Sequence, residues 1–422
     1  MKQNKPVFST LPILFVSSTL FIGLLNLTNF LNGYRDANIE IPYNKQQALA
    51  SIETKYTDNF IGKTNYVDLN GAFSLFLGRK ELNERFLLEN DFLTNTLIGG
   101  PSTYFLSYHD YWTYTDQTAS IQNVKNLHDY LALYGIPYAF LQTPHLLTTD
   151  DDPTIPAGYS TSVNDNSDRL LAGVAENGIP SLDMRASLQE QGLNSFDIFF
   201  KTDHHWTIEG AFWAHIQVAE YIDDLMGTSY ANPDYYDLAN YNIEIYENSF
   251  MGPSGSRTGI YYAGIDDFSV ITPNFDTEFQ VEIPNRDWYR TGPFDHAMLD
   301  YSYLENDINN MYKQDAYCTY LLPNTEYVKL VNLQATNDLK VLLVKDSFSM
   351  PMAAFLSLHF AEVHLCQQND HEEFLRTLHE IEPDVVLQMR TAVDRMSPQA
   401  LADLEANQPS YWSQVQPNSD NP

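Results

Sequence analysis

The stretch that decides the fold is Val341-Leu342-Leu343-Val344-Lys345-Asp346-Ser347-Phe348-Ser349. Its first four residues are all apolar, which is typical of a strand that is buried on both faces of a sheet. A helix is expected directly afterwards, over residues 350 to 358, so that Ser347 stands at a strand-to-helix turn. There, backbone N–H groups at the helix start can stabilise an oxyanion. Ser347 is therefore a candidate nucleophile, although a serine in this position can also simply cap a helix.

The same alternation of helix and short apolar strand recurs before and after this stretch. Helical spacing ends at Gly135 and at Gly178, and each of these glycines is followed at once by a short apolar run. Downstream of Ser347 the order is strand, helix, strand, over residues 362–366, 371–380 and 384–388. This alternation predicts an α/β fold with a parallel central sheet covered by helices, whose functional loops lie at the carboxyl ends of the strands.

A second informative stretch is Lys201-Thr202-Asp203-His204-His205-Trp206-Thr207-Ile208-Glu209-Gly210. Asp203 and His205 are separated by one residue and can meet around a tight turn, where the carboxylate would orient the imidazole and stabilise its protonated form. We expect a helix from Thr207 to about Met226, so both residues lie on the loop that leads into it. His205 then becomes a candidate general base for Ser347.

Other interpretations of the two histidines stay open at this stage. His204 could be the working base and His205 structural, or both could be hydrogen-bonded residues of a buried turn. Asp203, His204 and His205 could also bind a metal, but no further histidine or carboxylate recurs at ligand-like spacing, so we expect neither a metal nor a cofactor.

Composition limits the class of partner. The 422 residues include 23 Lys plus Arg and 55 Asp plus Glu, which gives a net charge of −32, and 14% of them are aromatic. This charge argues against binding to nucleic acid or to an anionic polymer, and it is compatible with a neutral glycan or with a role in solubility alone. The two cysteines, Cys318 and Cys366, form no metal-binding spacing and are expected either to pair or to be buried thiols.

The amino terminus predicts a membrane anchor. Lys2 and Lys5 precede an uncharged stretch from Pro6 to Tyr34, with its apolar centre at Leu11 to Leu27, which is long enough to cross a bilayer. A cleaved signal peptide shares this pattern, but no small-residue cleavage site follows the apolar run. We therefore expect residues 1–35 to be a cytoplasmic stub and an uncleaved anchor, with the remaining chain outside the cytoplasm.

The remaining segments follow from composition. Residues 36–100 are interpreted as a helical lead-in, residues 101–400 as the catalytic domain and residues 401–422 as a polar tail. An insertion rich in β structure and loops is expected at about 230–335. Aromatic residues at 104–114 and in Trp288-Tyr289-Arg290 are candidates for a binding surface.

Three blocks together resemble the DHHW protein family, a branch of the SGNH-hydrolase-like group that includes the proteins of alginate O-acetylation. The blocks are Asp203-His204-His205-Trp206 with Thr207, Glu209, Gly210 and Ala211, then Phe250-Met251-Gly252 through Thr258-Gly259, and Lys345-Asp346-Ser347-Phe348. The resemblance spans about residues 35–395. It implies an SGNH-like, flavodoxin-like three-layer sandwich with a parallel central sheet.

The resemblance also implies roles for individual residues: Ser347 as nucleophile, His205 as base and Asp203 as its orienting acid. Arg257, Gln142, His204 and Trp206 are further candidates to line the site or to hold an oxyanion. As in the alginate relatives, the acid and base precede the serine, the reverse of an ordinary SGNH hydrolase. In this sequence Lys345 occupies the place of the glycine that usually opens the serine block.

Two functions from different classes follow. The first is an O-acetyltransferase or acetylesterase that acts on a cell-surface or exported polysaccharide. For a transferase, the resemblance implies a multi-pass membrane O-acyltransferase as the partner that delivers the acetyl group. The second is a non-catalytic glycan-binding or scaffold protein of the cell envelope.

Overall fold

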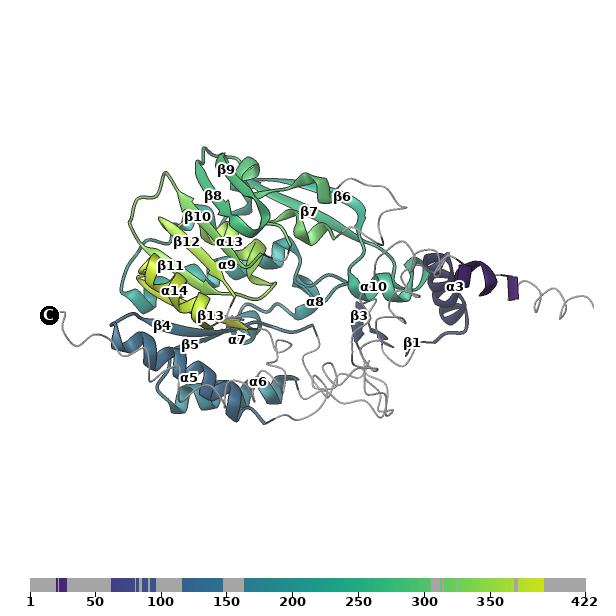
Figure 1. The fold of residues 1–422 in the computed structure, drawn as a ribbon, viewed down its shortest axis with the longest axis horizontal. Coiled ribbons are helices and arrows are strands. Elements are labelled where there is room, and N and C mark those ends of the chain that lie inside the picture. The colour runs from purple at the N-terminus through teal and green to yellow at the C-terminus, as the bar shows by residue number, and fades with distance from the viewer. Residues whose placement is uncertain are drawn as a thin grey trace, which may run out of the picture.

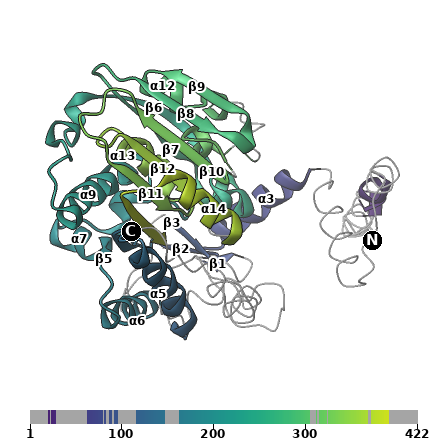
Figure 2. The same ribbon diagram turned by 60° about the vertical axis from the view of Figure 1, so that its left-hand side comes forward.

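The computed structural model describes residues 20–21, 23–28, 62–79, 81–82, 86–89, 92–95, 116–146, 163–304, 312, 315–323, 325–367 and 371–390. Most of these residues form an α/β body in which helices flank a central sheet (Figures 1 and 2). The predicted anchor lies largely outside the described residues, and the aromatic cluster at 104–114 and the polar tail at 401–422 lie entirely outside them.

The central sheet has eight strands in the order β5-β4-β13-β11-β12-β10-β8-β9. Its parallel half holds five of them: β5 (Ser181–Asp183), β4 (Tyr138–Gln142), β13 (Val385–Arg390), β11 (Lys340–Val344) and β12 (Glu362–Cys366). The strand β11 lies between β13 and β12, and its last four residues are buried. The apolar run before Ser347 is therefore a central strand, as its sequence predicts.

Two layers of helices cover this sheet and build two hydrophobic clusters. One layer packs on Phe140, Leu342 and Val386 of the sheet, and it consists of α5 (Thr118–Leu133), α6 (Val163–Glu176) and α14 (His371–Ile381). The other layer packs on Leu141, Leu343 and Leu387, and it consists of α7 (Met184–Glu190), α9 (Ile208–Met226) and α13 (Ser349–Leu356). The predicted three-layer α/β architecture is confirmed.

The sheet is mixed, however, and not wholly parallel as predicted. The antiparallel strands are β10 (Tyr327–Asn332), β8 (Phe279–Ile283) and β9 (Trp288–Gly292). They come from the loop-rich region at 230–335, which thus extends the central sheet. The physical reason is connection length: β8 and β9 are joined only by the short helix η4 (Pro284–Arg286), and a short link allows antiparallel pairing alone.

The same region contains a separate two-stranded sheet and several short helices (Figure 1). The sheet pairs β6 (Tyr241–Phe250) with β7 (Asp266–Pro273). The α-helices are α10 (Pro253–Thr258), α11 (Ile260–Ala263) and α12 (Phe294–Met298), and α8 (Ser195–Ile198) lies upstream. The 3₁₀ turns are η2 (Pro233–Tyr235), η3 (Leu238–Asn240), η5 (Tyr301–Leu304) and η6 (Ala316–Thr319).

The described part of the amino-terminal region differs from the predicted helical lead-in. It contains one helix, α3 (Lys63–Phe76), which is followed by a three-stranded sheet of β1 (Glu81–Leu82), β2 (Phe86–Glu89) and β3 (Phe92–Asn95). Gly71 on α3 fits closely against the Thr258 backbone, since a β-carbon there would approach its carbonyl oxygen to 2.4 Å. None of the helices in the described ranges is long and apolar enough to cross a membrane.

Candidate active site

Asp266 fixes the loop that carries the two histidines. Its carboxylate accepts hydrogen bonds from the backbone N–H groups of Lys201 and Thr202 (3.1 and 2.8 Å) and from the Thr202 hydroxyl (2.7 Å). The same hydroxyl oxygen accepts the backbone N–H of Gly252 (3.0 Å), and the Thr202 carbonyl accepts that of Gly255 (3.0 Å). The loop is therefore held between β7 and α10 before it reaches Asp203.

The helix α9 begins directly after the loop. Thr207 caps it by accepting the backbone N–H of Gly210 (3.1 Å), and Gly227 ends it with φ +65°. These boundaries match the helix predicted from Thr207 to about Met226. Gly210 allows a close approach, because a β-carbon there would lie 2.4 Å from the Ile198 carbonyl oxygen. This contact explains why the motif continues to a glycine.

Asp203, His205 and Ser347 form one chain of hydrogen bonds, although Ser347 follows His205 by 142 positions in the sequence. The Asp203 Oδ2 atom lies 3.0 Å from His205 Nδ1, and His205 Nε2 lies 2.7 Å from Ser347 Oγ. An ionised carboxylate can only accept, so Nδ1 carries the ring proton and Nε2 accepts the serine hydroxyl. Asp203 is fully buried and His205 nearly so, whereas Ser347 is exposed to solvent. The arrangement has the geometry of a serine, base and acid relay.

His204 binds the other oxygen of the same carboxylate. Asp203 Oδ1 lies 2.8 Å from His204 Nδ1 and accepts the His204 backbone N–H at 2.6 Å. The two imidazole rings lie with their centroids 3.9 Å apart. The His204 side chain is 41% exposed, so one face of this second ring is open to the solvent at the site.

Burial and the shared carboxylate separate the two histidines electrostatically. Burial alone would raise the pKa of Asp203, but His205 and His204 outweigh it and hold that pKa well below its usual range. Burial would lower the pKa of His204, yet Asp203, Asp315 and Asp346 together raise it above its ordinary value. For His205, burial and the neighbouring His204 lower the pKa, and Asp203 offsets this only in part. His204 therefore favours the charged form and His205 the neutral form that a general base requires.

The turn after β11 presents Ser347. The Asp346 carboxylate accepts the backbone N–H of Phe348 (3.0 Å) and the Ser349 hydroxyl (3.3 Å), which holds the turn at the start of α13. Lys345 continues the ladder of β11 through its backbone N–H to the Cys366 carbonyl (2.9 Å). Burial lowers the pKa of its side chain to about 8, against the opposing effect of Asp346. The glycine usual at this position is thus replaced by a partly buried lysine.

Aromatic rings enclose His205. The Tyr317 ring is stacked on its imidazole at 4.1 Å between centroids and 17° between planes, and the Phe348 ring lies 5.0 Å away. Trp206 is fully buried and meets Phe348 edge-on at 5.2 Å, so it packs behind the site. The burial that lowers the pKa of His205 comes in part from these rings.

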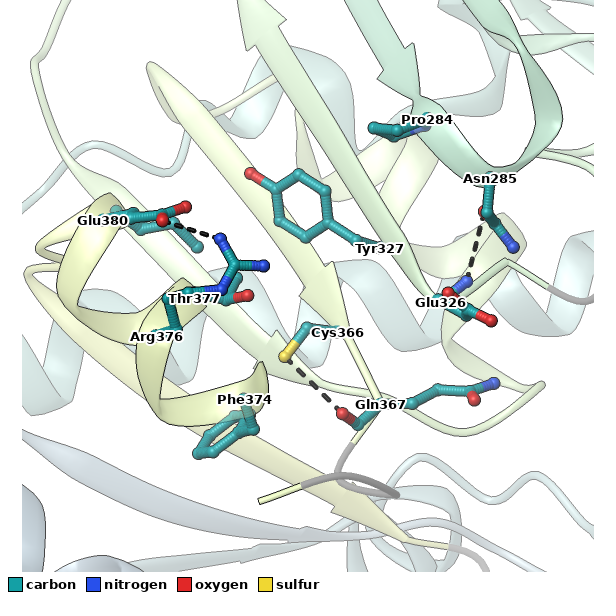
Figure 3. Close-up of a pocket in the computed structure, with 11 residues that line it drawn as sticks. Pro284, Asn285, Glu326, Tyr327, Cys366, Gln367, Phe374, Arg376, Thr377 and Glu380 are labelled. Carbon is teal, nitrogen blue, oxygen red and sulfur yellow. Dashed lines mark hydrogen bonds and ion pairs between the residues drawn. The ribbon is translucent and has the colours of Figure 1, made fainter. Parts of the chain in front are cut away.

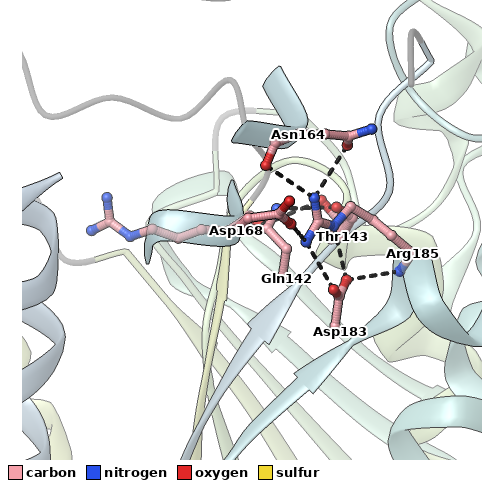
Figure 4. A network of polar contacts seen from close by, with 7 residues as sticks. Gln142, Thr143, Asn164, Asp168, Asp183 and Arg185 are labelled. Carbon is pink, nitrogen blue, oxygen red and sulfur yellow. Dashed lines mark hydrogen bonds and ion pairs between the residues drawn. The ribbon is translucent and has the colours of Figure 1, made fainter. Parts of the chain in front are cut away.

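Gln142, a predicted candidate to line the site, is hydrogen-bonded at the ends of two strands. It is 1% exposed and donates hydrogen bonds to the carbonyls of Thr143 and Arg390, at the ends of β4 and β13. It lies beside a polar network centred on Arg185 (Figure 4), which binds Asp183, Asp168 and Asn164. Neither of these hydrogen bonds joins Gln142 to Ser347.

The remaining residues singled out from the sequence differ in their exposure to solvent and in their contacts. Arg257 is exposed in the last turn of α10 and forms no hydrogen bond or ion pair with the described residues. In the cluster at residues 288–290, Trp288 is 8% exposed and the Arg290 guanidinium lies 3.4 Å from its ring centroid, so only Tyr289 is broadly exposed. Cys318 and Cys366 are both free thiols.

A cavity of about 790 Å³ lies apart from the relay. It opens between α14 and the start of β10 (Figure 3), and its walls include Tyr327, Cys366 and Arg376. None of Asp203, His205 and Ser347 lines it. The Tyr327 hydroxyl is bound to His364 Nδ1 (2.7 Å), whose Nε2 atom is bound to Glu362 (2.8 Å). Because these polar groups satisfy one another, we base the site on the relay and not on this cavity.

Asp203, His204 and His205 also place their potential ligand atoms within 4.8 Å of one another. A divalent metal could in principle be held by such a set. In this arrangement, however, both carboxylate oxygens already bind imidazole nitrogens and the remaining nitrogen of His205 binds Ser347. Both carboxylate oxygens and both nitrogens of His205 are thus engaged in a hydrogen-bonded relay.

Comparisons with known proteins show what this chain resembles. Residues 105–247 match a family model described as SGNH hydrolase-like domain, acetyltransferase AlgX. The matched stretch includes Asp203 to Trp206 and ends before Ser347. Residues 105–247 are thus similar to an SGNH hydrolase-like domain. Sequence comparison with curated proteins gives no match.

Solved structures show the same fold. Bacillus cereus PatB1 with a sulfonyl adduct is 16% identical, with 75% of this chain and 98% of that chain covered and a TM-score of 0.57. A DHHW family protein from Eubacterium siraeum is 15% identical, with 76% and 96% covered and a TM-score of 0.52. The predicted resemblance to this group is confirmed at the level of the fold.

Sequence reasoning missed two residues of the site. Asp266 stands at the start of a strand in the loop-rich region, 64 and 65 positions from the two residues that it binds, and no local pattern marks it. Tyr317 is one of 28 tyrosines and follows Asp315 in a segment without periodicity. Only the three-dimensional contact with His205 distinguishes it.

Proposed function

We propose that this protein is an extracytoplasmic, membrane-anchored O-acetyltransferase that uses Ser347, His205 and Asp203 to move acetyl groups onto a cell-surface or exported polysaccharide. The observation that carries the proposal is the 2.7 Å contact between His205 Nε2 and the exposed Ser347 Oγ, with Asp203 on the opposite ring nitrogen. The acetyltransferase named in the matched family description supports transfer over hydrolysis.

The first half-reaction forms an acetyl-enzyme. Ser347 Oγ attacks the carbonyl carbon of an acetyl donor while its proton passes to His205 Nε2. The Asp203 carboxylate stabilises the resulting imidazolium through Nδ1–H. When the tetrahedral intermediate collapses, the bond from carbon to the leaving oxygen or sulfur breaks, and His205 returns the proton to the leaving group. The acetyl group is then an ester on Ser347.

The second half-reaction reverses these roles. His205, neutral again, takes the proton from a sugar hydroxyl, whose oxygen attacks the acetyl carbon. Collapse of this second intermediate breaks the bond to Ser347 Oγ, and His205 protonates the serine. Water in place of the sugar gives an esterase by the same steps.

The negative oxygen of both intermediates needs a donor. Within the turn, the backbone N–H groups of Asp346, Phe348 and Ser349 are hydrogen-bonded to Ser349 or Asp346. The N–H of Ser347 itself forms no hydrogen bond with the described residues. We assign it as an oxyanion donor, at the start of α13 where the helix dipole adds to it.

Charge and the amino-terminal sequence support the remaining parts of the proposal. A net charge of −32 favours an uncharged acceptor over an anionic polymer. The apolar stretch after Lys2 and Lys5 supports an anchor that leaves the catalytic domain outside the cytoplasm. There, a multi-pass membrane O-acyltransferase would supply the acetyl group.

A sulfonyl fluoride tests the nucleophile directly. An activated serine displaces fluoride, so that Ser347 Oγ becomes bonded to sulfur and hydrogen fluoride is released. We expect peptide mapping of the full chain to find the sulfonyl group on Ser347, and to find none in the His205→Ala variant or in unfolded protein. Labelling elsewhere, or equal labelling of the His205→Ala variant, would contradict the proposed relay.

Turnover provides the second test. The full chain should release acetate from p-nitrophenyl acetate, and Ser347→Ala and His205→Ala should each abolish the release. Unchanged release in both variants would disprove the catalytic assignment. If Ser347 is labelled by neither reagent and the parent protein binds glycan without turnover, the protein is instead a binding or scaffold protein of the envelope.

A further inference from the structure

Tyr317 covers one face of the His205 imidazole. Their ring planes differ by 17° and their centroids are 4.1 Å apart, which is a stacked contact. Phe348 approaches the same imidazole at 5.0 Å with its plane tilted by 51°. The Tyr317 ring therefore restricts the His205 imidazole largely to rotation within its own plane.

The tyrosine ring is itself held firmly. Tyr317 lies in η6, where the Asp315 side chain accepts its backbone N–H at 3.2 Å. Its ring is 5% exposed and meets Phe200 edge-on at 6.5 Å. It belongs to the same hydrophobic cluster as Trp206 and Phe348, so it is a fixed part of the core.

The hydroxyl of Tyr317 forms no well-aligned hydrogen bond with a residue that the structure describes, although the Trp206 indole lies close to it. Its oxygen is also shielded from solvent, which prevents a substrate atom from reaching it without displacement of the ring. The contribution of Tyr317 to the site must then come from the ring face that touches His205.

We infer that Tyr317 is a positioning residue for the base of the proposed relay: its ring holds the His205 imidazole in the plane that directs Nε2 at Ser347 and keeps water from that face. This inference rests on the proposed function only for its kinetic consequences. The contact itself also determines how His205 titrates, which can be measured without any substrate.

Removal of the ring has a defined electrostatic effect. The titratable groups around His205 are Asp203 and His204 on its own loop, Asp315 and Cys318 beside Tyr317, and Asp346 on the serine turn. A Tyr317→Ala change leaves all of these in place and removes only covering surface. Water then reaches the imidazole, its charged form is less disfavoured, and the pKa of His205 rises.

The experiment compares Tyr317→Phe, Tyr317→Leu and Tyr317→Ala in the full chain. Tyr317→Phe keeps the ring, whereas Tyr317→Leu fills most of the space without a flat face, and thermal unfolding shows which variants are folded. We expect kcat/KM for p-nitrophenyl acetate to fall about tenfold or more in the leucine and alanine variants. We also expect the acidic limb of the pH profile to move up by about one unit in Tyr317→Ala. Tyr317→Phe should match the parent in both.

An NMR titration of the labelled histidines, assigned with His205→Gln, gives the pKa of His205 independently. A rise in Tyr317→Ala and parent-like behaviour in Tyr317→Phe support the inference even if the parent protein turns over no acetyl ester, a result that would count against the proposed function alone. An unchanged His205 pKa in a folded Tyr317→Ala protein overturns it. Loss of activity in Tyr317→Phe equal to that in Tyr317→Ala also overturns it, because the hydroxyl would then be the essential group.

Discussion

Gly252 packs directly against Asp203, so closely that a β-carbon on the glycine would lie 2.4 Å from the Asp203 β-carbon. Its φ of −63° is one that any residue adopts, so the need for glycine here is steric and not conformational. The acid of the relay is thus held by a backbone surface that tolerates no side chain.

Gly252→Ala should therefore displace Asp203. Overpacking of this kind costs about 1–3 kcal/mol of unfolding free energy, and the shifted carboxylate should lower kcat/KM as well. Chemical denaturation and p-nitrophenyl acetate hydrolysis measure the two effects. The matched control is Gly227→Ala at the end of α9, where φ is +65° and no atom lies within 4 Å of the added carbon. It should lose stability without loss of kcat/KM; an equal activity loss in both variants would argue against a specific role for the contact.

Asp203→Asn tests the orienting acid. The amide keeps the shape of the side chain but removes the charge that binds both Nδ1 atoms. The neutral tautomer of His205 would no longer be fixed, and kcat should fall by about 10⁴. Sulfonyl labelling of Ser347 should slow in parallel. Retention of more than a tenth of the parent rate would show that Asp203 does not orient the base.

The two histidines should titrate at different pH values, and the acidic limb of the activity profile should follow His205. Because the pKa of His205 is lowered, its neutral, active form persists below pH 6.5, and activity is lost only as the pH falls through that lowered value. His204, whose pKa is raised, keeps its charge to above pH 6.5. The acidic limb of kcat/KM, which reports the free enzyme, should therefore lie below pH 6.5.

His204→Gln removes the positive charge that helps to keep His205 neutral. The pKa of His205 should rise, and the acidic limb of kcat/KM should move up by about one pH unit. His204→Lys, which retains a positive charge, serves as the control and should move the limb less. A limb in the same place for all three proteins would show that the second histidine does not tune the base.

Arg185→Gln should affect stability but not catalysis. The guanidinium binds Asp183 through two nitrogens (2.9 and 2.8 Å) and Asp168 through one (2.7 Å) (Figure 4). It thereby joins α7 to β5 and α6. Asp168 is 66% exposed, so its share is reduced by solvent. We expect a loss of about 2 kcal/mol in unfolding free energy. A fall in kcat/KM at a temperature where the variant is folded would contradict this assignment.

The parallel half of the fold could be predicted from the sequence because its signals are local. Apolar runs such as Val341 to Val344 and capped helices such as that from Thr207 to Gly227 depend on neighbouring residues alone. The antiparallel strands β8 to β10 could not be placed, since their pairing depends on partners that the loop-rich segment does not mark. The strands β1 to β3 lie in a region that was expected to be helical, and they were not predicted for the same reason.

For the site, the chemical type of a residue predicted its role better than its place in the expected secondary structure did. Asp203, His205 and Ser347 were selected by their chemistry and by the resemblance, and the structure brings their side chains together. Gln142 was a candidate to line the site, and its amide nitrogen donates to neighbouring carbonyls instead. Tyr317 acts by contact between ring faces, for which a sequence carries no pattern.

The position of β13 determines when the central sheet is continuous. This last described strand lies between β4 and β11, and so it joins the part of the sheet made first to the strand that leads into the Ser347 turn. Until residues 385–390 have been synthesised, β4 and β11 have no common neighbour in the sheet. The sheet that supports the serine turn is therefore completed by a strand that is made after Ser347 itself.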